Sequence, residues 1–289
     1  MAKQKDRWPE LCERVAQDDG LPTRDSGRWA EQKLKFWNAY IHITTTAMVD
    51  HPGWPSGLVY VDLFAGPGVC SIRETNRRLP GSPLIAAHAP KPFRKIVLCE
   101  LETENAQACE IRLKQSPANH AFKVFCGDCN NQIAEIVKEI PHGALTLAFL
   151  DPTGLHARMD TICKLSSAGR VDLLILFPDA IDVLRNVDAY FSQPESSLDQ
   201  VLGADSNWRD EWKALGGADG SKARRLFVTL YKRQLEKHAN YKVFGEAVIK
   251  GPNGPLYRLV FASKHERGLE FWEKVTKKEL GGQMLMDYD

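Results

Sequence analysis

Tyr60-Val61-Asp62-Leu63-Phe64-Ala65-Gly66-Pro67-Gly68 is a short apolar run with an acidic residue near its end, followed by a break into Gly-Pro-Gly. Near-continuous apolar runs are typical of parallel strands that are buried on both faces. Gly66 and Gly68 allow the following turn to bring bare backbone against a ligand, and Pro67 stiffens that turn. The stretch predicts a strand and a nucleotide-type binding loop, but strand-then-glycine turns are common, so the context has to decide.

Three later apolar runs repeat this plan of a strand that ends on a carboxylate. They cover residues 95–100, 122–128 and 145–151, and their last acidic residues are Glu100, Asp128 and Asp151. In an open parallel sheet the carboxyl ends of the strands meet at one edge, which is where ligands bind. The four strand ends together therefore predict a single binding crevice.

The spacing around the glycine loop disfavours NAD or FAD as the ligand. A dinucleotide-binding fold needs Gly-x-Gly-x-x-Gly at the start of a helix, with an acidic residue about 20 residues later. The third glycine is missing here, and the distance from Gly68 to Glu100 is longer.

The remaining pattern resembles the class I S-adenosylmethionine-dependent methyltransferases. This resemblance implies S-adenosylmethionine as the cofactor, with Glu100 accepting hydrogen bonds from the two ribose hydroxyls and Asp128 beside the adenine amino group. The amino-acid part of the cofactor would be held by the first strand end and its loop, at Asp62, Phe64, Ala65, Gly66, Pro67 and Gly68. The ring of Phe64 itself fits the core better.

Asp151-Pro152-Thr153-Gly154 falls where amino-methylating members of that class carry Asp/Asn-Pro-Pro-aromatic, which grips the acceptor nitrogen. We therefore expect Asp151 and Pro152 to be catalytic, with Asp151 facing the acceptor, so that Asp151→Ala would spare cofactor binding and remove turnover. Thr153 and Gly154, together with Arg73, are the candidate substrate residues. Thr153 and Gly154 depart from the pattern, because no aromatic residue follows the proline to stack on a flipped base.

A more specific resemblance is to the three-Cys-motif partner family of bacteria, also written TcmP, over roughly residues 27 to 276. It rests on the combination of five short segments: Asp62–Gly68, Ile72–Thr75, Gly81–Leu84, Asp151–Leu155 and Phe261–His265. The resemblance implies a methyltransferase-like fold and a partner, the three-Cys-motif protein, which resembles radical enzymes. It implies no substrate.

Three functions follow from these motifs. The first is methylation of nucleic acid or of a modified small molecule, together with the three-Cys-motif partner. The alternative is a non-catalytic or regulatory protein that docks to that partner, which the missing aromatic favours and the four carboxylate-ended strands disfavour. A magnesium-dependent nuclease is a third and weaker reading of the paired carboxylates.

The order of elements predicts an α/β, Rossmann-like, doubly wound and mostly parallel sheet in a single domain, residues 1–289. Residues 1–55 form an N-terminal helical segment in this scheme, 56–180 the cofactor-binding core, 181–240 a helical insertion, and 241–289 a terminal hairpin and helix. Helices are expected at 29–48, 102–114 and 131–139. The helix at 29–48 either covers the cofactor edge or, as we favour, packs on the sheet. The turn Gly251-Pro252-Asn253-Gly254 predicts the antiparallel hairpin.

Composition excludes a strong general attraction to nucleic acid or membrane. The 38 basic and 37 acidic side chains leave a net charge of +1, so only local patches could act, and Arg73, Arg77 and Arg78 in one expected loop are a candidate. No apolar run reaches the length of about 18 residues that spans a membrane, and the charged N-terminus has no signal core.

Seven cysteines in a chain of this length predict reduced thiols and a cytoplasmic protein. Cys126 and Cys129 have the spacing of half a metal site, but no second pair completes it. We therefore expect no metal, and we expect Cys126 to be a buried strand residue.

Overall fold

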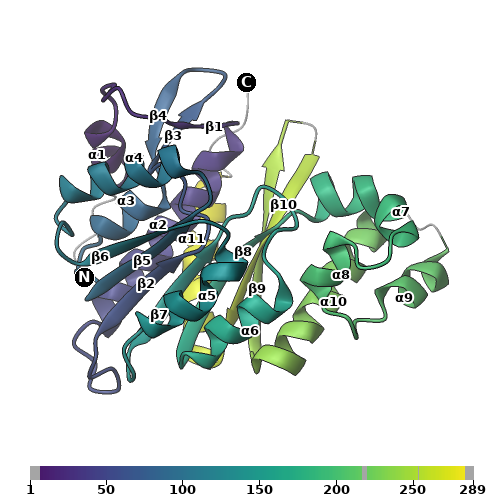
Figure 1. The fold of residues 1–289 in the computed structure, drawn as a ribbon. Coiled ribbons are helices and arrows are strands. Elements are labelled where there is room, and N and C mark those ends of the chain that lie inside the picture. Colours follow the sequence, from purple (N-terminus) through teal and green to yellow (C-terminus); the bar gives the residue numbers. More distant parts are fainter. Residues whose placement is uncertain (1–6, 217–219, 253, 284–289) are drawn as a thin grey trace.

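The computed structural model describes residues 7–216, 220–252 and 254–283. Its centre is a seven-stranded sheet in the order β6-β5-β2-β7-β8-β10-β9, with helices against both faces (Figure 1). The strands of this sheet are β2 (Leu58–Asp62), β5 (Lys95–Glu100), β6 (Phe122–Cys126), β7 (Leu145–Leu150), β8 (Arg170–Phe177), β9 (Val243–Gly251) and β10 (Gly254–Ser263).

The strand directions confirm the fold class predicted from the sequence. Strands β6, β5, β2, β7 and β8 pair in parallel, whereas β10 is antiparallel to both β8 and β9. The chain runs outward from β2 to β6 and then returns to β7 on the other side of β2. The point between β2 and β7 is therefore the topological switch point, where a crevice opens at the carboxyl ends of the strands.

The alternation of side chains along β2 divides the core into two clusters. Leu58 and Tyr60 face a cluster that includes side chains of α2, α3 and α11, while Val59 and Val61 face a second one with α5, α6 and α10. The helices are α1 (Trp8–Arg14), α2 (Trp29–Met48), α3 (Ser82–Ala87), α4 (Thr103–Lys114), α5 (Cys129–Lys138), α6 (Met159–Ser167), α7 (Leu184–Ser192), α8 (Ser197–Leu202), α9 (Trp208–Leu215), α10 (Gly220–Ala239) and α11 (Glu266–Gln283).

Helix α2 packs on the sheet, as favoured from the sequence. The ring of Trp37 stacks on Phe149 with 4.8 Å between centroids, and its Nε1 donates to the hydroxyl of Tyr60 at 3.0 Å. All three side chains are buried. Aromatic pairs of this kind add about 0.5–1.5 kcal/mol beyond the area they bury, so the helix is firmly placed.

A second, small sheet was not predicted. Strands β1 (Arg24–Ser26) and β3 (Val69–Ile72) pair in parallel, and β3 pairs antiparallel with β4 (Arg77–Pro80). Arg77 and Arg78 thus lie on a strand, and the prediction that they share one loop with Arg73 was wrong. These strands have three or four residues, too few for alternation to be recognised.

The expectation that Cys126 is buried was also wrong. Strand β6 is at the edge of the large sheet and Cys126 is exposed at its end, whereas Cys129 is buried at the start of α5. An edge strand has a neighbouring strand on one side only, and an apolar sequence pattern does not reveal which strand lies at the edge.

After β8 the chain forms a π-helix, η1 (Asp179–Val183), and then the predicted helical insertion, α7 to α9, which forms with α10 the lobe at the right of Figure 1. The hairpin of β9 and β10 is also as predicted, although Asn253 of its turn lies outside the described residues. Among the helices that are described, none has the length and apolar character needed to cross a membrane.

Candidate functional site

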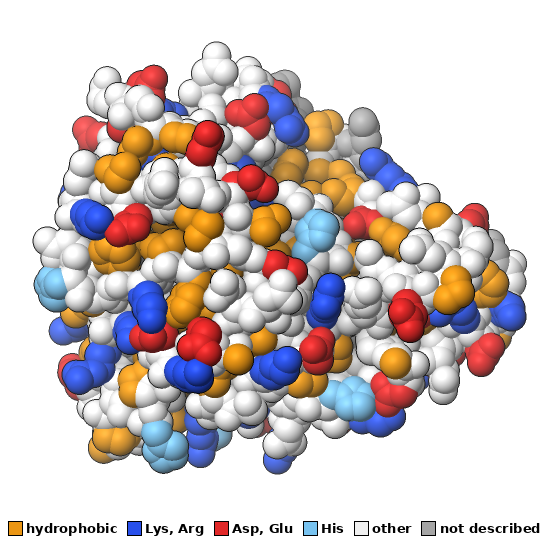
Figure 2. Space-filling view, in the orientation of Figure 1, with side chains coloured by type: hydrophobic (Ala, Val, Ile, Leu, Met, Phe, Trp, Pro, Cys, Tyr) orange, Lys and Arg blue, Asp and Glu red, His pale blue; other side chains and the backbone are white. Residues whose placement is uncertain are grey.

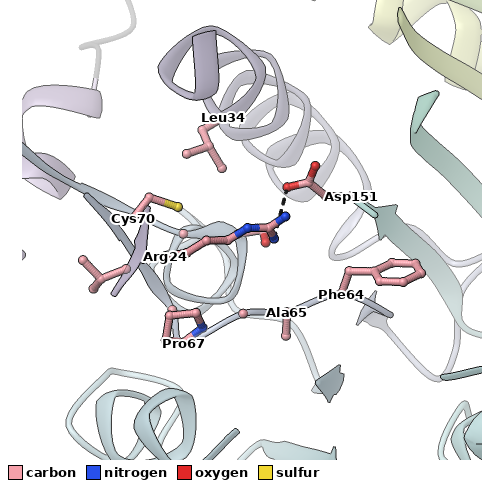
Figure 3. Close-up of a pocket in the computed structure, with 12 residues that line it drawn as sticks. Arg24, Leu34, Phe64, Ala65, Pro67, Cys70 and Asp151 are labelled. Atoms are coloured by element: carbon pink, nitrogen blue, oxygen red, sulfur yellow. Dashed lines mark ion pairs between the residues drawn. The ribbon is translucent and has the colours of Figure 1, made fainter. Parts of the chain in front are cut away.

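The glycine loop, residues 64–68, and Asp151 line one pocket at the switch point of the sheet (Figure 3). The pocket has a free volume of about 10 Å³, which is room for roughly one water molecule. Its lining residues are Arg24, Leu34, Phe64, Ala65, Gly66, Pro67, Gly68, Val69, Cys70, Gly81, Ser82 and Asp151. Asp62, Glu100, Asp128, Arg73 and Thr153 are not among them.

Glycine is required in this loop by the backbone conformation. Gly66 has φ +63° and Gly68 has φ +86°, and residues other than glycine rarely adopt such positive angles. Gly81 is needed for a different reason: its amide donates to the carbonyl of Gly68 at 2.8 Å, and a β-carbon there would lie 2.9 Å from that carbonyl carbon and oxygen. Gly81, from the end of the following hairpin, therefore packs directly against the glycine loop.

Asp62 is completely buried behind the loop. Its carboxylate accepts hydrogen bonds from the amide of Phe64 at 3.0 Å, the hydroxyl of Tyr60 at 3.0 Å and the hydroxyl of Ser82 at 2.6 Å. Burial raises the pKa of Asp62 to about 6, although these hydrogen bonds act in the opposite direction. With its oxygens directed at the protein, Asp62 holds the shape of the loop.

The raised pKa of Asp62 predicts that the free energy of unfolding depends on pH. The pKa in the folded chain, about 6, lies above the ordinary value of 3.8. At pH values between these two, the native state therefore binds more protons than the unfolded state does. Stability relative to Asp62→Asn should therefore fall by about 2 kcal/mol as the pH rises from about 4 to 6.5. Urea unfolding of both proteins across this range measures the difference. A constant difference would show that Asp62 does not titrate there.

Glu100 and Asp128 lie half-buried at the ends of the next two strands. Glu100 accepts from the amide of Gly66 at 2.7 Å and from the amide of Glu102 at 3.0 Å, so it connects β5 directly to the glycine loop. Asp128 caps α5, and its Oδ1 accepts from the backbone and side-chain nitrogens of Asn130, both at 2.8 Å. Both carboxylates are placed at the expected edge.

Asp151 is joined to two basic residues from the N-terminal part of the chain. The ammonium group of Lys33, on α2, donates to Oδ2 of Asp151, and the guanidinium of Arg24, on β1, lies 3.9 Å from the same oxygen. Asp151 and Lys33 are 5% and 2% exposed, so their charges are shielded from water. Oδ1 of Asp151 is buried and has no hydrogen-bond partner in the described part of the chain.

Neither Lys33 nor Arg24 was recognised from the sequence. Lys33 lies four residues from both Trp29 and Trp37, so it shares the apolar face of the helix, and a lysine in that stripe is a signal of a buried carboxylate partner. Arg24 is on a three-residue polar strand that carries no comparable signal.

The other candidate residues lie outside the pocket. Pro152 and Gly154 are buried, whereas Thr153 and Arg73 are exposed. The rings of Trp29 and Tyr257 lie 4.6 Å apart, and Nζ of Lys33, which donates to Asp151, is 4.9 Å from the Trp29 ring. Figure 2 shows hydrophobic side chains gathered in a hollow of the surface near the β9–β10 hairpin.

Comparison with known proteins gives likeness in structure without likeness in sequence. No family model matches the chain, and no curated protein matches it in sequence. An O-methyltransferase from Bacillus cereus in complex with SAH has 12% identity and a TM-score of 0.48, over 91% of this chain and 94% of that one.

Two further structures are similar at the same level. Cofactor-bound Rv0187 from MTB has 12% identity and a TM-score of 0.46, over 92% of this chain and 93% of that one. The O-methyltransferase TomG from Streptomyces achromogenes, in complex with SAM, has 9% identity and a TM-score of 0.43, over 92% and 100%. At such identities the likeness concerns the fold alone, and function has to be argued from the site.

Within residues 7–216, 220–252 and 254–283, no group of three or more His, Cys, Asp or Glu side chains is arranged to hold a metal ion. All seven cysteines are outside disulfides. The four carboxylates at the strand ends accept hydrogen bonds from backbone amides, hydroxyls or Lys33, and within the described residues Oδ1 of Asp151 has no partner.

Proposed function

We propose that this chain binds S-adenosylmethionine at the switch point of the sheet and is a methyltransferase. The observation that carries the proposal is the link between the glycine loop and the end of the neighbouring strand, in which Glu100 accepts from the amide of Gly66. A half-buried carboxylate beside bare backbone suits a ligand with adjacent hydroxyls next to an amino-acid group.

The chemistry of the residues fits this cofactor. Gly66 and Gly68 give the close backbone approach, and Glu100 and Asp128 offer acceptors for ribose hydroxyls and for an adenine amino group. The unpartnered Oδ1 of Asp151 is a further acceptor. The pocket's free volume is too small for the cofactor, because the side chain of Arg24 extends over the glycine loop (Figure 3). Arg24 therefore has to move when the cofactor enters.

When bound, the cofactor would supply a methyl group that is already activated. The chain's own contribution would be to align an acceptor and keep water away, and an external base is often unnecessary for this transfer. Pro152, Thr153 and Gly154, directly after Asp151, would form the wall on the acceptor side, with Arg73 near its entrance. The pair of Trp29 and Tyr257 would supply the aromatic surface that the Asp-Pro-Thr-Gly sequence lacks.

We further propose, from the sequence resemblance, that the protein is a three-Cys-motif partner, works with the three-Cys-motif protein in a bacterial cytoplasm, and methylates nucleic acid or a modified small molecule. The second candidate is a docking protein without turnover. The nearly filled pocket and the pairing of Asp151 with Lys33 favour that candidate.

Calorimetric titration with S-adenosylmethionine and S-adenosylhomocysteine tests the cofactor site. We expect micromolar binding by the wild type and a roughly 10–100-fold weaker Kd for Glu100→Ala, because each hydrogen bond to a charged acceptor contributes about 1.5–3 kcal/mol. The matched control is Glu135→Ala, an exposed carboxylate on α5 whose partner is Lys138, and it should bind like the wild type.

Absence of binding to the wild type would contradict the methyltransferase proposal and leave the docking protein. Capture of the purified three-Cys-motif protein on the immobilised chain would then test that second candidate directly. Binding that Glu100→Ala leaves unchanged would place the cofactor elsewhere on the chain.

A further inference from the structure

The guanidinium of Arg24 is a cation without a hydrogen-bonded carboxylate in the described chain. Its nearest carboxylate in the described chain is Asp151, at 3.9 Å, which is too long for a hydrogen bond. The side chain is about a quarter exposed, and its guanidinium is permanently charged. A hypothetical β-carbon on Gly66 would lie 3.8 Å from Cδ of Arg24, so the side chain covers the loop that the cofactor would touch.

Asp151 is an anion with one oxygen that lacks a hydrogen-bond donor in the described chain. Lys33 and Arg24 both lie at its Oδ2, while Oδ1 is buried without a partner. A buried carboxylate oxygen without a hydrogen bond is unfavourable, because it has lost its contacts with water without gaining a donor in the protein. A donor that reaches Oδ1 from the pocket would therefore be strongly favoured.

Arg24 and Asp151 thus line one pocket together, and the only link between them in the described chain is a long ion pair between the guanidinium and Oδ2 (Figure 3). An α-amino acid presents the matching pair, because its carboxylate and its ammonium group are attached to the same carbon atom. Asp62 is less suited to the ammonium group, because it is completely buried, does not line the pocket and already accepts from Phe64, Tyr60 and Ser82.

We propose that Arg24 and Asp151 together bind the amino-acid end of the cofactor, with the guanidinium on its carboxylate and Oδ1 on its ammonium group. This inference rests on the proposed function and adds a residue from outside the nucleotide-binding core. It also changes the role expected for Asp151, which becomes a binding residue for the cofactor.

Three ligands that carry both, one or neither of these two groups test the clamp. S-adenosylmethionine carries both groups, decarboxylated S-adenosylmethionine lacks only the carboxylate, and 5′-methylthioadenosine lacks both. Arg24→Ala should weaken binding of the first by roughly 30-fold or more, which is the effect of removing one partner of a buried charge pair, and leave the other two within about threefold. Arg24→Lys should restore part of the preference for the carboxylate.

Asp151→Asn should weaken binding of both ligands that keep the amino group and spare 5′-methylthioadenosine. Arg14→Ala, an exposed arginine on α1 paired with Glu10, is the control that should change none of the three. Thermal unfolding of each variant establishes that it is folded.

The possible results separate the two proposals. Failure of the wild type to bind any of the three ligands would overturn the proposed function and the clamp with it. Binding of S-adenosylmethionine by the wild type, combined with an equal loss for all three ligands in Arg24→Ala, would overturn the clamp alone.

Discussion

Lys33→Met is expected to lower the free energy of unfolding by about 3–5 kcal/mol, as found when one member of a buried ion pair is removed. The ammonium group of Lys33 is the close partner of Asp151, and both residues are buried. Methionine matches the length of the lysine stem, so the packing around Trp29 should persist while the carboxylate loses its counter-charge. Chemical denaturation of wild type and variant measures the loss.

Two controls identify the cause of this loss. The double variant Lys33→Met, Asp151→Asn should regain most of the stability, because no unpaired charge remains. Lys164→Met removes an exposed lysine that lies 3.7 Å from Asp160 on α6, and it should cost less than about 1 kcal/mol. A loss for Lys33→Met as small as that of Lys164→Met would mean that the charge of Asp151 is compensated by other groups.

Gly81→Ala is expected to damage the cofactor site through the backbone of the glycine loop. The added β-carbon would lie 2.9 Å from the carbonyl of Gly68, so the loop has to shift and the 2.8 Å hydrogen bond between the two glycines is strained. We expect a stability loss of about 1–3 kcal/mol from overpacking and a fall of at least about tenfold in affinity for S-adenosylhomocysteine.

Gly220→Ala is the matched control for this prediction. Among the described residues, a β-carbon at Gly220 would meet only Leu184, at 3.5 Å, which is ordinary van der Waals contact. Stability within about 0.5 kcal/mol of the wild type and unchanged affinity are therefore expected. An unchanged affinity in Gly81→Ala as well would show that the position of the Gly68 carbonyl does not matter for the ligand.

Most of the large sheet could be predicted because each of its strands is a local signal. The run ending at Asp62, and those ending at Glu100 and Asp151, are apolar over five or six residues and end on a polar residue. Helix α2 was predicted with its observed ends from a loose helical stripe of apolar residues between Trp29 and Ile43. Local patterns of this length therefore predicted secondary structure that the folded chain has.

The rest of the candidate site depends on contacts between distant segments. Lys33 and Asp151 are separated by 118 residues, and Gly81 meets Gly68 across a hairpin. Strand β1 is Arg-Asp-Ser, whose composition favours a turn or a helix cap over a strand, and only its pairing with β3 makes it extended. Without the fold, nothing in these residues identifies their partners.

The ion pair between α2 and the end of β7 also constrains the order in which the chain can fold. Lys33 leaves the ribosome first, but its partner Asp151 follows 118 residues later, after β2, β5 and β6 have been made. Contacts of such long sequence separation require the closure of a large loop, which slows folding. The pocket therefore cannot form on a nascent chain that ends before β7, and ligand binding during synthesis would report that the central strands have assembled.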